Sequence, residues 1–155
     1  MTAGYKAPGS STYTQLKVSG VTPETTTMVF DESESATKTF EDAPAISFTK
    51  TNKTVVLRYT IKNTGSAAIT VTKNFTETSK TNVTVKYAAL NDQASIPTSD
   101  PTTWQDTAGD ALTDATSIAA SKTLCFYVQI TLSDDTSIAQ FAGAYNFIID
   151  AVDAN

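Results

Sequence analysis

The chain has 155 residues, a net charge of −5 and a pI near 4.5, and 40% of its residues are hydrophobic. This length predicts a single domain with a hydrophobic core of its own. Eleven basic residues are scattered among sixteen acidic ones and form no continuous positive track. This argues against nucleic-acid binding, because phosphate neutralisation needs clustered Lys and Arg.

Threonine dominates the polar residues, with 29 in the chain, whereas only 17% of all residues are charged. Threonine is β-branched and suits the solvent face of a strand, so this composition is typical of secreted and cell-surface β-proteins. No stretch has the length of a transmembrane helix, and we expect no signal peptide before residue 1. We therefore expect either a mature extracellular or cell-surface form, or a protein that is made and assembled in the cytoplasm.

Residues 1–20 predict an N-terminal arm. The first eleven residues, MTAGYKAPGSS, are small and polar and are broken by Gly4, Pro8 and Gly9. They predict a segment that is flexible or that waits for a partner, since they cannot form a core element on their own. Residues 12–19 alternate weakly between two faces, which predicts a short strand.

Residues 21–155 predict one β-domain. Short strands are expected at 26–30 and 46–48, before the strongest pattern of the chain, at 54–72. There, apolar and polar residues alternate on both sides of the turn Asn63–Ser66, which predicts two half-buried strands joined as an antiparallel hairpin. The residues expected on its apolar face are Val55, Leu57, Tyr59, Ile61, Ile69 and Val71.

Three further strands are expected towards the C-terminus, at 82–90, 124–132 and 144–152. In the second of these, every other residue is a large apolar one, which predicts a strand with one fully buried face. The segment 91–121 is irregular in pattern. We interpret it as a long connection that contains one helical turn, at Asp110–Ala115.

Seven to nine short strands without a long amphipathic helix predict an all-β fold, an antiparallel β-sandwich of immunoglobulin-like or jelly-roll-like kind. The single cysteine, Cys125, excludes an intrachain disulfide. It lies in an apolar strand, so we interpret it as a small buried hydrophobic residue. The missing disulfide and the loop position of Trp104 exclude an antibody-type domain.

The chain contains no histidine and no glycine-rich phosphate loop. This removes histidine-dependent catalytic sets, histidine zinc sites and nucleotide binding, so we expect a protein that is not an enzyme. Ca²⁺ is the one cofactor that the residues suggest, because turn carboxylates supply the hard oxygen ligands that it prefers. The candidate ligands are Asp106, Asp110 and Asp114, spaced by four residues, and Asp134 and Asp135.

Three N-x-Thr sequons are candidate glycosylation sites, at Asn52, Asn74 and Asn82. Each lies at or near the end of an expected strand, where a glycan would project into water. Trp104 has two interpretations: it closes one end of the core, or it offers a face on which a sugar can stack.

The segment LRYTIKNTGSAAITV resembles a pattern common in surface immunoglobulin-like domains of bacteria and archaea, and FYVQITLSDDTS and GAYNFIIDA extend the likeness. Over about half of the chain, the sequence resembles the TasA/camelysin-type biofilm matrix proteins and the related archaeal bundling pilins. Members of that group are secreted and polymerise by donating an N-terminal strand to the next subunit. The resemblance implies that residues 3–18 are the donor segment, with the donor positions Thr12, Thr14, Leu16 and Val18.

These observations predict a non-enzymatic structural subunit of an extracellular filament, pilus or biofilm matrix fibre that self-associates into a homopolymer. Two alternatives stay open, a phage tail or decoration protein and a carbohydrate- or surface-binding module. Glycan binding that is abolished by Trp104→Ala would favour the binding module.

Overall fold

In the computed structural model, the described residues are 1–29, 38–42, 48–74, 83–111, 115–132 and 148–153. They form eight strands and one four-residue helix: β1 (Thr2–Lys6), β2 (Thr14–Gln15), β3 (Thr54–Lys62), β4 (Ile69–Asn74), β5 (Val83–Gln93), α1 (Ala108–Ala111), β6 (Ala115–Ile118), β7 (Thr123–Leu132) and β8 (Ile148–Asp153). Every strand pair is antiparallel, which confirms the predicted all-β class. Among these residues, no helix has the length and apolar character needed to cross a membrane.

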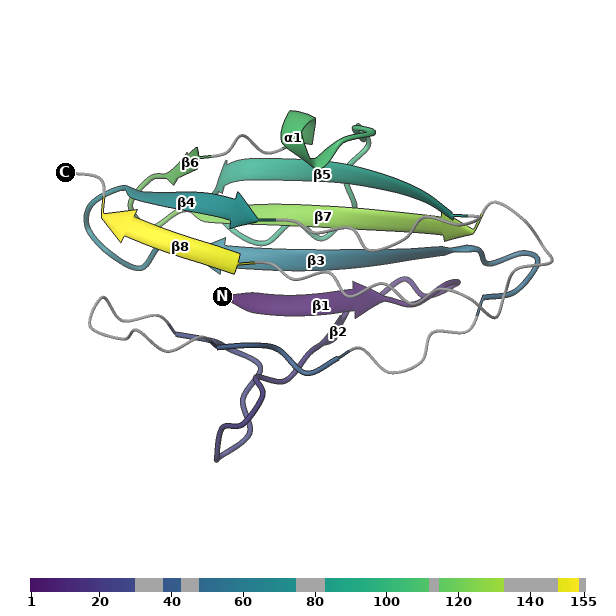
Figure 1. Cartoon of the computed structure of the whole chain (residues 1–155), viewed down its shortest axis with the longest axis horizontal. Coiled ribbons are helices and arrows are strands. Elements are labelled where there is room, and N and C mark those ends of the chain that lie inside the picture. Colours follow the sequence, from purple (N-terminus) through teal and green to yellow (C-terminus); the bar gives the residue numbers. More distant parts are fainter. Residues whose placement is uncertain (30–37, 43–47, 75–82, 112–114, 133–147, 154–155) are drawn as a thin grey trace.

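The larger sheet has five strands in the order β2-β1-β3-β7-β5 (Figure 1). Its longest ladder joins β3 to β7, from the pair Thr54↔Thr131 to the pair Lys62↔Thr123. On its other side β7 pairs with β5. β7 is buried along most of its length on both faces, as the almost unbroken apolar run TLCFYV allows. It is therefore the strand that holds the larger sheet together.

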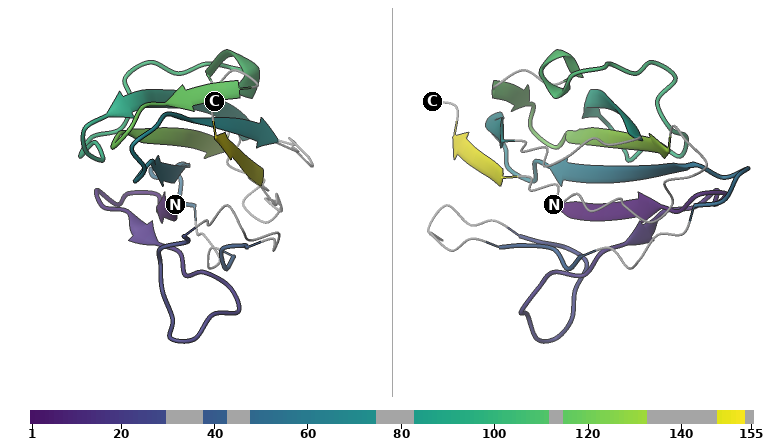
Figure 2. Two further views of the ribbon diagram at one scale, coloured as in Figure 1. Left: turned by 90° about the vertical axis from the view of Figure 1, so that its left-hand side faces the viewer. Right: turned by 45° about the vertical axis from the view of Figure 1, so that its right-hand side comes forward.

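The smaller sheet has three strands in the order β6-β4-β8 and lies against part of the larger sheet (Figures 1 and 2). β4 pairs with β6 from Ile69↔Ile118 to Thr72↔Ala115 and with β8 from Ile69↔Asp153 to Asn74↔Ile148. Val71 of β4 and Ile118 of β6 are fully buried and belong to the same hydrophobic cluster as residues of β3, β5 and β7. The two sheets therefore share one core.

The faces of β3 and β7 follow the predicted alternation. Leu57 is partly buried and packs against the shared core, and the other apolar residues expected on this face belong to it: Val55, Tyr59, Ile61, Leu124, Phe126, Val128, Ile130 and Leu132. Full burial of a side chain of this size contributes about 1.5–3 kcal/mol. Since register shifts by one residue would turn all of these side chains to the other face, the core fixes the register of the central ladder.

The predicted hairpin of β3 and β4 is wrong, although both strands exist. β3 pairs with β1 and β7, whereas β4 pairs with β6 and β8, so the chain passes from one sheet to the other between them. The buried side chain of Asn63 explains the crossing. Its amide nitrogen donates to the backbone oxygens of Ala67, Ile118 and Ala119, at 2.8, 3.0 and 3.3 Å, and its oxygen accepts from the backbone nitrogen of Gly65 at 2.9 Å. These bonds tie the connection to the end of β6 instead of folding it into a tight turn.

Two further expectations need correction. The polar first eleven residues do contain a strand: residues 2–6 form β1, because β3 offers them an open edge with which to pair. The described part of the expected strand 26–30 is not a strand, although Met28 is buried and exchanges backbone hydrogen bonds with Met1. The expected strand 46–48 lies mostly outside the described residues, and its last residue, Phe48, is buried in the core.

The C-terminal half agrees more closely with the expectations. The strand expected at 82–90 is β5, which begins at Val83 and continues to Gln93. The helical turn expected at Asp110–Ala115 overlaps α1, which begins two residues earlier and ends at Ala111. The expectation that 91–121 is a connection is wrong at residues 115–118, which form β6, because the edge of β4 offers them a partner. Of the strand expected at 144–152, residues 148–152 lie in β8, and residues 144–147 lie outside the described part of the chain.

Candidate functional site

The most distinctive feature of the larger sheet is the way in which its N-terminal strands are attached. β1 pairs with β3 over five positions, from Thr2↔Thr60 to Lys6↔Val56. β2 pairs with β1 alone, through Gly4↔Gln15 and Tyr5↔Thr14. The N-terminal hairpin, residues 1–15, is thus added to the edge of β3 and has no other strand partner in the described structure. β3 would be an edge strand without it.

Gly4 allows β2 to approach β1 this closely. A Cβ atom at Gly4 would lie 2.9 Å from the backbone oxygen of Thr14, which is closer than side-chain carbons come to such an atom. A larger residue at position 4 would therefore push β2 away from β1.

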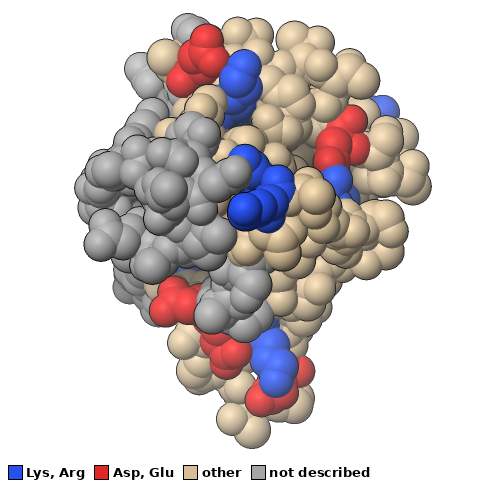
Figure 3. Space-filling view, turned by 90° about the vertical axis from the view of Figure 1, so that its right-hand side faces the viewer, with Lys and Arg blue, Asp and Glu red and all other residues tan. Residues whose placement is uncertain are grey.

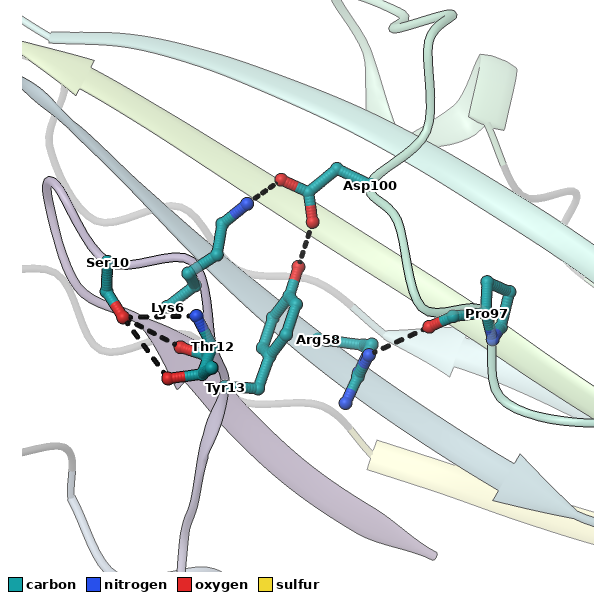
Figure 4. A network of polar contacts seen from close by, with 7 residues as sticks. All are labelled: Lys6, Ser10, Thr12, Tyr13, Arg58, Pro97 and Asp100. Atoms are coloured by element: carbon teal, nitrogen blue, oxygen red, sulfur yellow. Dashed lines mark hydrogen bonds and ion pairs between the residues drawn. The ribbon is translucent and has the colours of Figure 1, made fainter.

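A group of polar contacts binds the N-terminal hairpin to the rest of the molecule (Figure 4). Asp100, in the loop between β5 and α1, contacts Lys6 Nζ through Oδ2 and accepts a 2.7 Å hydrogen bond from the Tyr13 hydroxyl through Oδ1. The Lys6 and Asp100 side chains are only 21% and 25% exposed. Lys6 is the last residue of β1, and Tyr13 directly precedes β2. One carboxylate outside the hairpin therefore binds it on both sides of its turn.

Arg58 of β3 completes this arrangement, which we call the Asp100 network (Lys6, Tyr13, Arg58, Pro97 and Asp100). Its guanidinium carbon lies 3.9 Å from the centre of the Tyr13 ring, and Nη1 donates to the backbone oxygen of Pro97 at 3.3 Å. Lys6 Nζ lies 5.7 Å from the centre of the same ring. Cations over an aromatic face are attracted by its negative potential, so the ring of Tyr13 adds to the attachment made by its hydroxyl.

Burial raises the pKa of the Tyr13 hydroxyl well above that of free tyrosine, and the hydrogen bond to Asp100 and the charge of that carboxylate raise it further. The nearby charge of Arg58 has the opposite, smaller effect. The phenol therefore stays protonated through the neutral and mildly alkaline range and continues to donate to Asp100.

A second hydrophobic cluster lies beside the Asp100 network, on the face of the larger sheet that is turned away from the shared core. It contains Val56, Ala88, Cys125 and Tyr127, with Tyr13, Leu90 and Trp104 packed against it. The Trp104 ring meets the Tyr127 ring edge to face, with centres 6.4 Å apart at an interplanar angle of 82°. Trp104 is half-buried and covers this outer face of the sheet. The expectation that it closes one end of the core is therefore wrong, since it packs on the face that is turned away from the core.

Cys125 is fully buried in this cluster, as predicted from its apolar strand. Burial raises the pKa of its thiol, while weak interactions with Thr60, Arg58 and Tyr127 act in the opposite direction. A protonated and inaccessible thiol is a poor nucleophile, so Cys125 acts as a packing residue.

The donor positions predicted from the resemblance lie in different environments. Thr12 and Thr14 are exposed, Leu16 packs against the shared core, and Val18 is buried and forms an isolated bridge with Phe40. The segment that pairs with β3 is β1, at residues 2–6. The expected donor segment, residues 3–18, thus includes most of β1, whereas the four donor positions lie after β1 in the chain.

Of the candidate Ca²⁺ ligands, only Asp106 has a described side chain. The Asp106 carboxylate is 85% exposed and lies 3.6 Å from Lys86 Nζ, and Asp110 lies in α1. Asp114, Asp134 and Asp135 lie outside the described residues. Within the described ranges, no three acidic or cysteine side chains lie close enough to hold a metal ion.

The three candidate glycosylation sites lie in different parts of the chain. Asn52 is exposed in the turn before β3, where its backbone nitrogen donates to Thr49 Oγ1 at 3.1 Å. Asn74 is the last residue of β4, and Asn82 lies outside the described residues. Asn52 is thus the sequon asparagine with a described, accessible side chain.

Comparisons with protein-family models, with curated proteins and with solved structures found no match to this chain. The interpretation of the site therefore rests on the geometry of the N-terminal hairpin and of the Asp100 network.

Proposed function

We propose that this chain is a non-enzymatic structural subunit that polymerises into an extracellular filament, pilus or biofilm matrix fibre by exchange of its N-terminal strand. In this proposal β1 leaves the edge of its own β3 and pairs with β3 of the next subunit. The observation that carries the proposal is that, among the described strands, β1 and β2 pair with the rest of the larger sheet only along the edge of β3.

Strand exchange needs no contacts beyond those already present within one subunit. The five backbone pairs between β1 and β3 are the same whether both strands belong to one chain or to two. β1 also buries little: Ala3 is its one residue in the shared core cluster, so its departure opens no large cavity. When each subunit gives its strand to the next subunit and receives one from the subunit before it, the contact is head to tail. Such a contact extends into an open filament if the rotation between subunits does not close a ring.

The surface is compatible with close packing of many identical copies. Figure 3 shows one face of the molecule, on which charged side chains are few and occur singly or in small groups of mixed sign. Neighbouring charges of opposite sign partly cancel at a distance, which limits repulsion between identical subunits, since long-range repulsion grows with net charge. The composition, rich in threonine and with 17% charged residues, is typical of secreted and cell-surface β-proteins and supports an extracellular location.

We also infer that the two sheets form a β-sandwich of immunoglobulin-like kind. Support comes from the shared core, in which Val71 and Ile118 of the smaller sheet join residues of β3, β5 and β7. The passage of the chain from β3 in one sheet to β4 in the other is the kind of connection that such sandwiches use.

The test is negative-stain electron microscopy of the full chain and of a variant that lacks residues 1–20. Filaments from the full chain alone are expected. Monodisperse particles in both samples at high concentration would refute the proposal.

A disulfide that ties β1 to its own β3, and that can be reduced, provides a matched control. Thr2 and Thr60 are directly paired, so cysteines at both positions, in a Cys125→Ala background, are close enough to form a disulfide that holds β1 in its own subunit. We expect monomers from the oxidised protein and filaments after reduction. Filaments of the same kind before reduction would show that β1 is not the exchanged strand.

A further inference from the structure

The Asp100 network is divided between the segment that would be exchanged and the segment that would stay. Lys6 lies in β1 itself, whereas Asp100 lies in the loop that follows β5, 94 residues away in sequence. Any exchange that removes β1 from its own sheet therefore also removes Lys6 from its own Asp100.

This separation does not depend on where the chain bends. Two exposed glycines with positive φ, Gly9 at 80° and Gly20 at 72°, lie after β1 and after β2. Glycine tolerates a change of backbone conformation at such positions, so either turn can act as the hinge. A hinge at Gly9 moves Lys6 alone, and a hinge at Gly20 moves Lys6 and Tyr13 together.

A cation beside the Asp100 carboxylate compensates for the hydration that this carboxylate loses by burial. The Asp100 side chain is three-quarters buried, and the Tyr13 hydroxyl is a neutral donor. Removing one partner of a largely buried ion pair leaves a charge whose lost hydration is no longer compensated. An acceptor subunit without Lys6 would therefore favour an incoming strand that brings a cation to Asp100.

Building on the proposed function, we propose that the ion pair between Lys6 and Asp100 forms between subunits, with Lys6 of the inserted strand bound to Asp100 of the subunit that receives it. The partner is a second copy of this chain. Lys6 faces Val56 in the β1–β3 ladder, so a cation reaches Asp100 only in the register Thr2↔Thr60 to Lys6↔Val56. A slip of two residues would place Gly4 or Pro8 there, and neither carries a charge. The ion pair thus selects the register of insertion.

Charge reversal separates contacts within a subunit from contacts between subunits. A Lys6→Glu variant and an Asp100→Lys variant each bring like charges together, so each alone is expected to form roughly tenfold less sedimentable polymer than wild type, or none.

When the two variants are mixed, opposite charges meet at both kinds of junction. The β1 strand of the Lys6→Glu variant, which is negative at position 6, inserts beside the loop of the Asp100→Lys variant, which is positive at position 100. The unchanged Lys6 of the second variant inserts beside the unchanged Asp100 of the first. We expect the mixture to recover polymer that contains the two variants in equal amounts and in alternation.

A pair that lies wholly outside the N-terminal hairpin provides the control. Lys86 and Asp106, at 3.6 Å, are on β5 and in the loop that follows it. Lys86→Glu and Asp106→Lys are therefore expected to polymerise alone as wild type does, with no gain on mixing. A double variant, Lys6→Glu with Asp100→Lys, restores opposite charges at the site and is expected to polymerise on its own.

The results discriminate between this inference and the proposed function. If wild type polymerises but the two variants do not complement each other, the ion pair between subunits is refuted and strand exchange is not. If wild type does not polymerise, the proposed function itself fails.

If a charge-reversed variant does not fold, a second measurement tests the inference. Lys6→Cys and Asp100→Cys variants, each in a Cys125→Ala background, are mixed and treated with a short thiol-to-thiol cross-linker. Cross-linked pairs of unlike subunits support the inference, and their absence from polymer that has formed contradicts it.

Discussion

The hydroxyl of Tyr13 donates to Asp100 Oδ1 at 2.7 Å, across a sequence separation of 87 residues. This one bond joins the N-terminal hairpin to the loop after β5. Its acceptor is charged and its donor stays protonated because burial raises the pKa of Tyr13. It is therefore among the stronger hydrogen bonds of the described structure.

Tyr13→Phe is expected to lower the free energy of unfolding by about 1.5–3 kcal/mol, the range for a hydrogen bond to a charged group. Urea denaturation of wild type, Tyr13→Phe, Asp100→Asn and the double variant would give the coupling between the two residues. Lys17→Ala is a suitable control, since its partner Glu24 is 71% exposed and we expect no measurable change. A coupling close to zero would show that the bond does not contribute.

Asn63→Ala is expected to destabilise the fold by several kcal/mol, because three backbone oxygens and one backbone nitrogen lose a partner, each at about 1–3 kcal/mol when buried. Asn63→Asp keeps the acceptor for Gly65 but brings a carboxylate against backbone oxygens, so we expect at least as large a loss. Urea midpoints measure both effects, with the exposed Thr64→Ala as control. A loss for Asn63→Ala no larger than that for Thr64→Ala would contradict this role.

Gly4→Ala is expected to loosen the hairpin while the centre of the sheet stays intact. The added Cβ would lie 2.9 Å from the Thr14 oxygen, so β2 must move away from β1. Amide hydrogen exchange should then become faster at residues 2–6 and 14–15 and stay unchanged in β7. Unchanged protection in β1 and β2 would show that the hairpin absorbs the extra carbon without separating.

Stability is expected to fall in alkali because of Tyr59. Burial raises its pKa to about 12, against about 10 in an unfolded chain. As the pH rises from about 10 to about 12, the unfolded state loses a proton that the folded state keeps, so the free energy of unfolding decreases. Two pKa units correspond to about 3 kcal/mol.

Tyr59→Phe removes this ionisation, and its unfolding free energy should change less with pH over that range than that of wild type. Urea denaturation at a series of alkaline pH values measures the difference. Parallel curves for the two proteins would contradict the prediction.

The sequence predicted those parts of the fold that alternation alone determines. In β3 and β7, every second residue is large and apolar, as Tyr59 and Phe126 are. The fold class, the strand positions and the buried face could therefore be inferred from local sequence. The pairing of strands could not, because it depends on contacts between distant residues. The turn Asn63–Ser66 fits a hairpin as well as a crossing between sheets, and only the oxygens of Ile118 and Ala119 near β6 decide between them.

The Asp100 network had no signal in the sequence. Lys6 lies in a polar stretch broken by glycine and proline, and Asp100 lies in a connection that is irregular in pattern. β1 itself was missed because its five residues alternate weakly, and its strand conformation depends on the edge of β3. The one local hint was Arg58, a cation in the middle of an otherwise strong strand, which a single sequence does not distinguish from a solvent-exposed position.

The position of β7 has a consequence for the order in which the chain can fold as it is synthesised. β3 and β5, which lie on its two sides, are made earlier but do not pair with each other. Until residues 123–132 have left the ribosome, β5 has no strand partner in its sheet, and β3 is paired along one edge only, with β1. The main ladder is therefore closed late, by contacts of long sequence separation, which favours slow folding. During that interval an open apolar strand is available to other chains, so the timing of β7 governs whether the nascent subunit folds or aggregates.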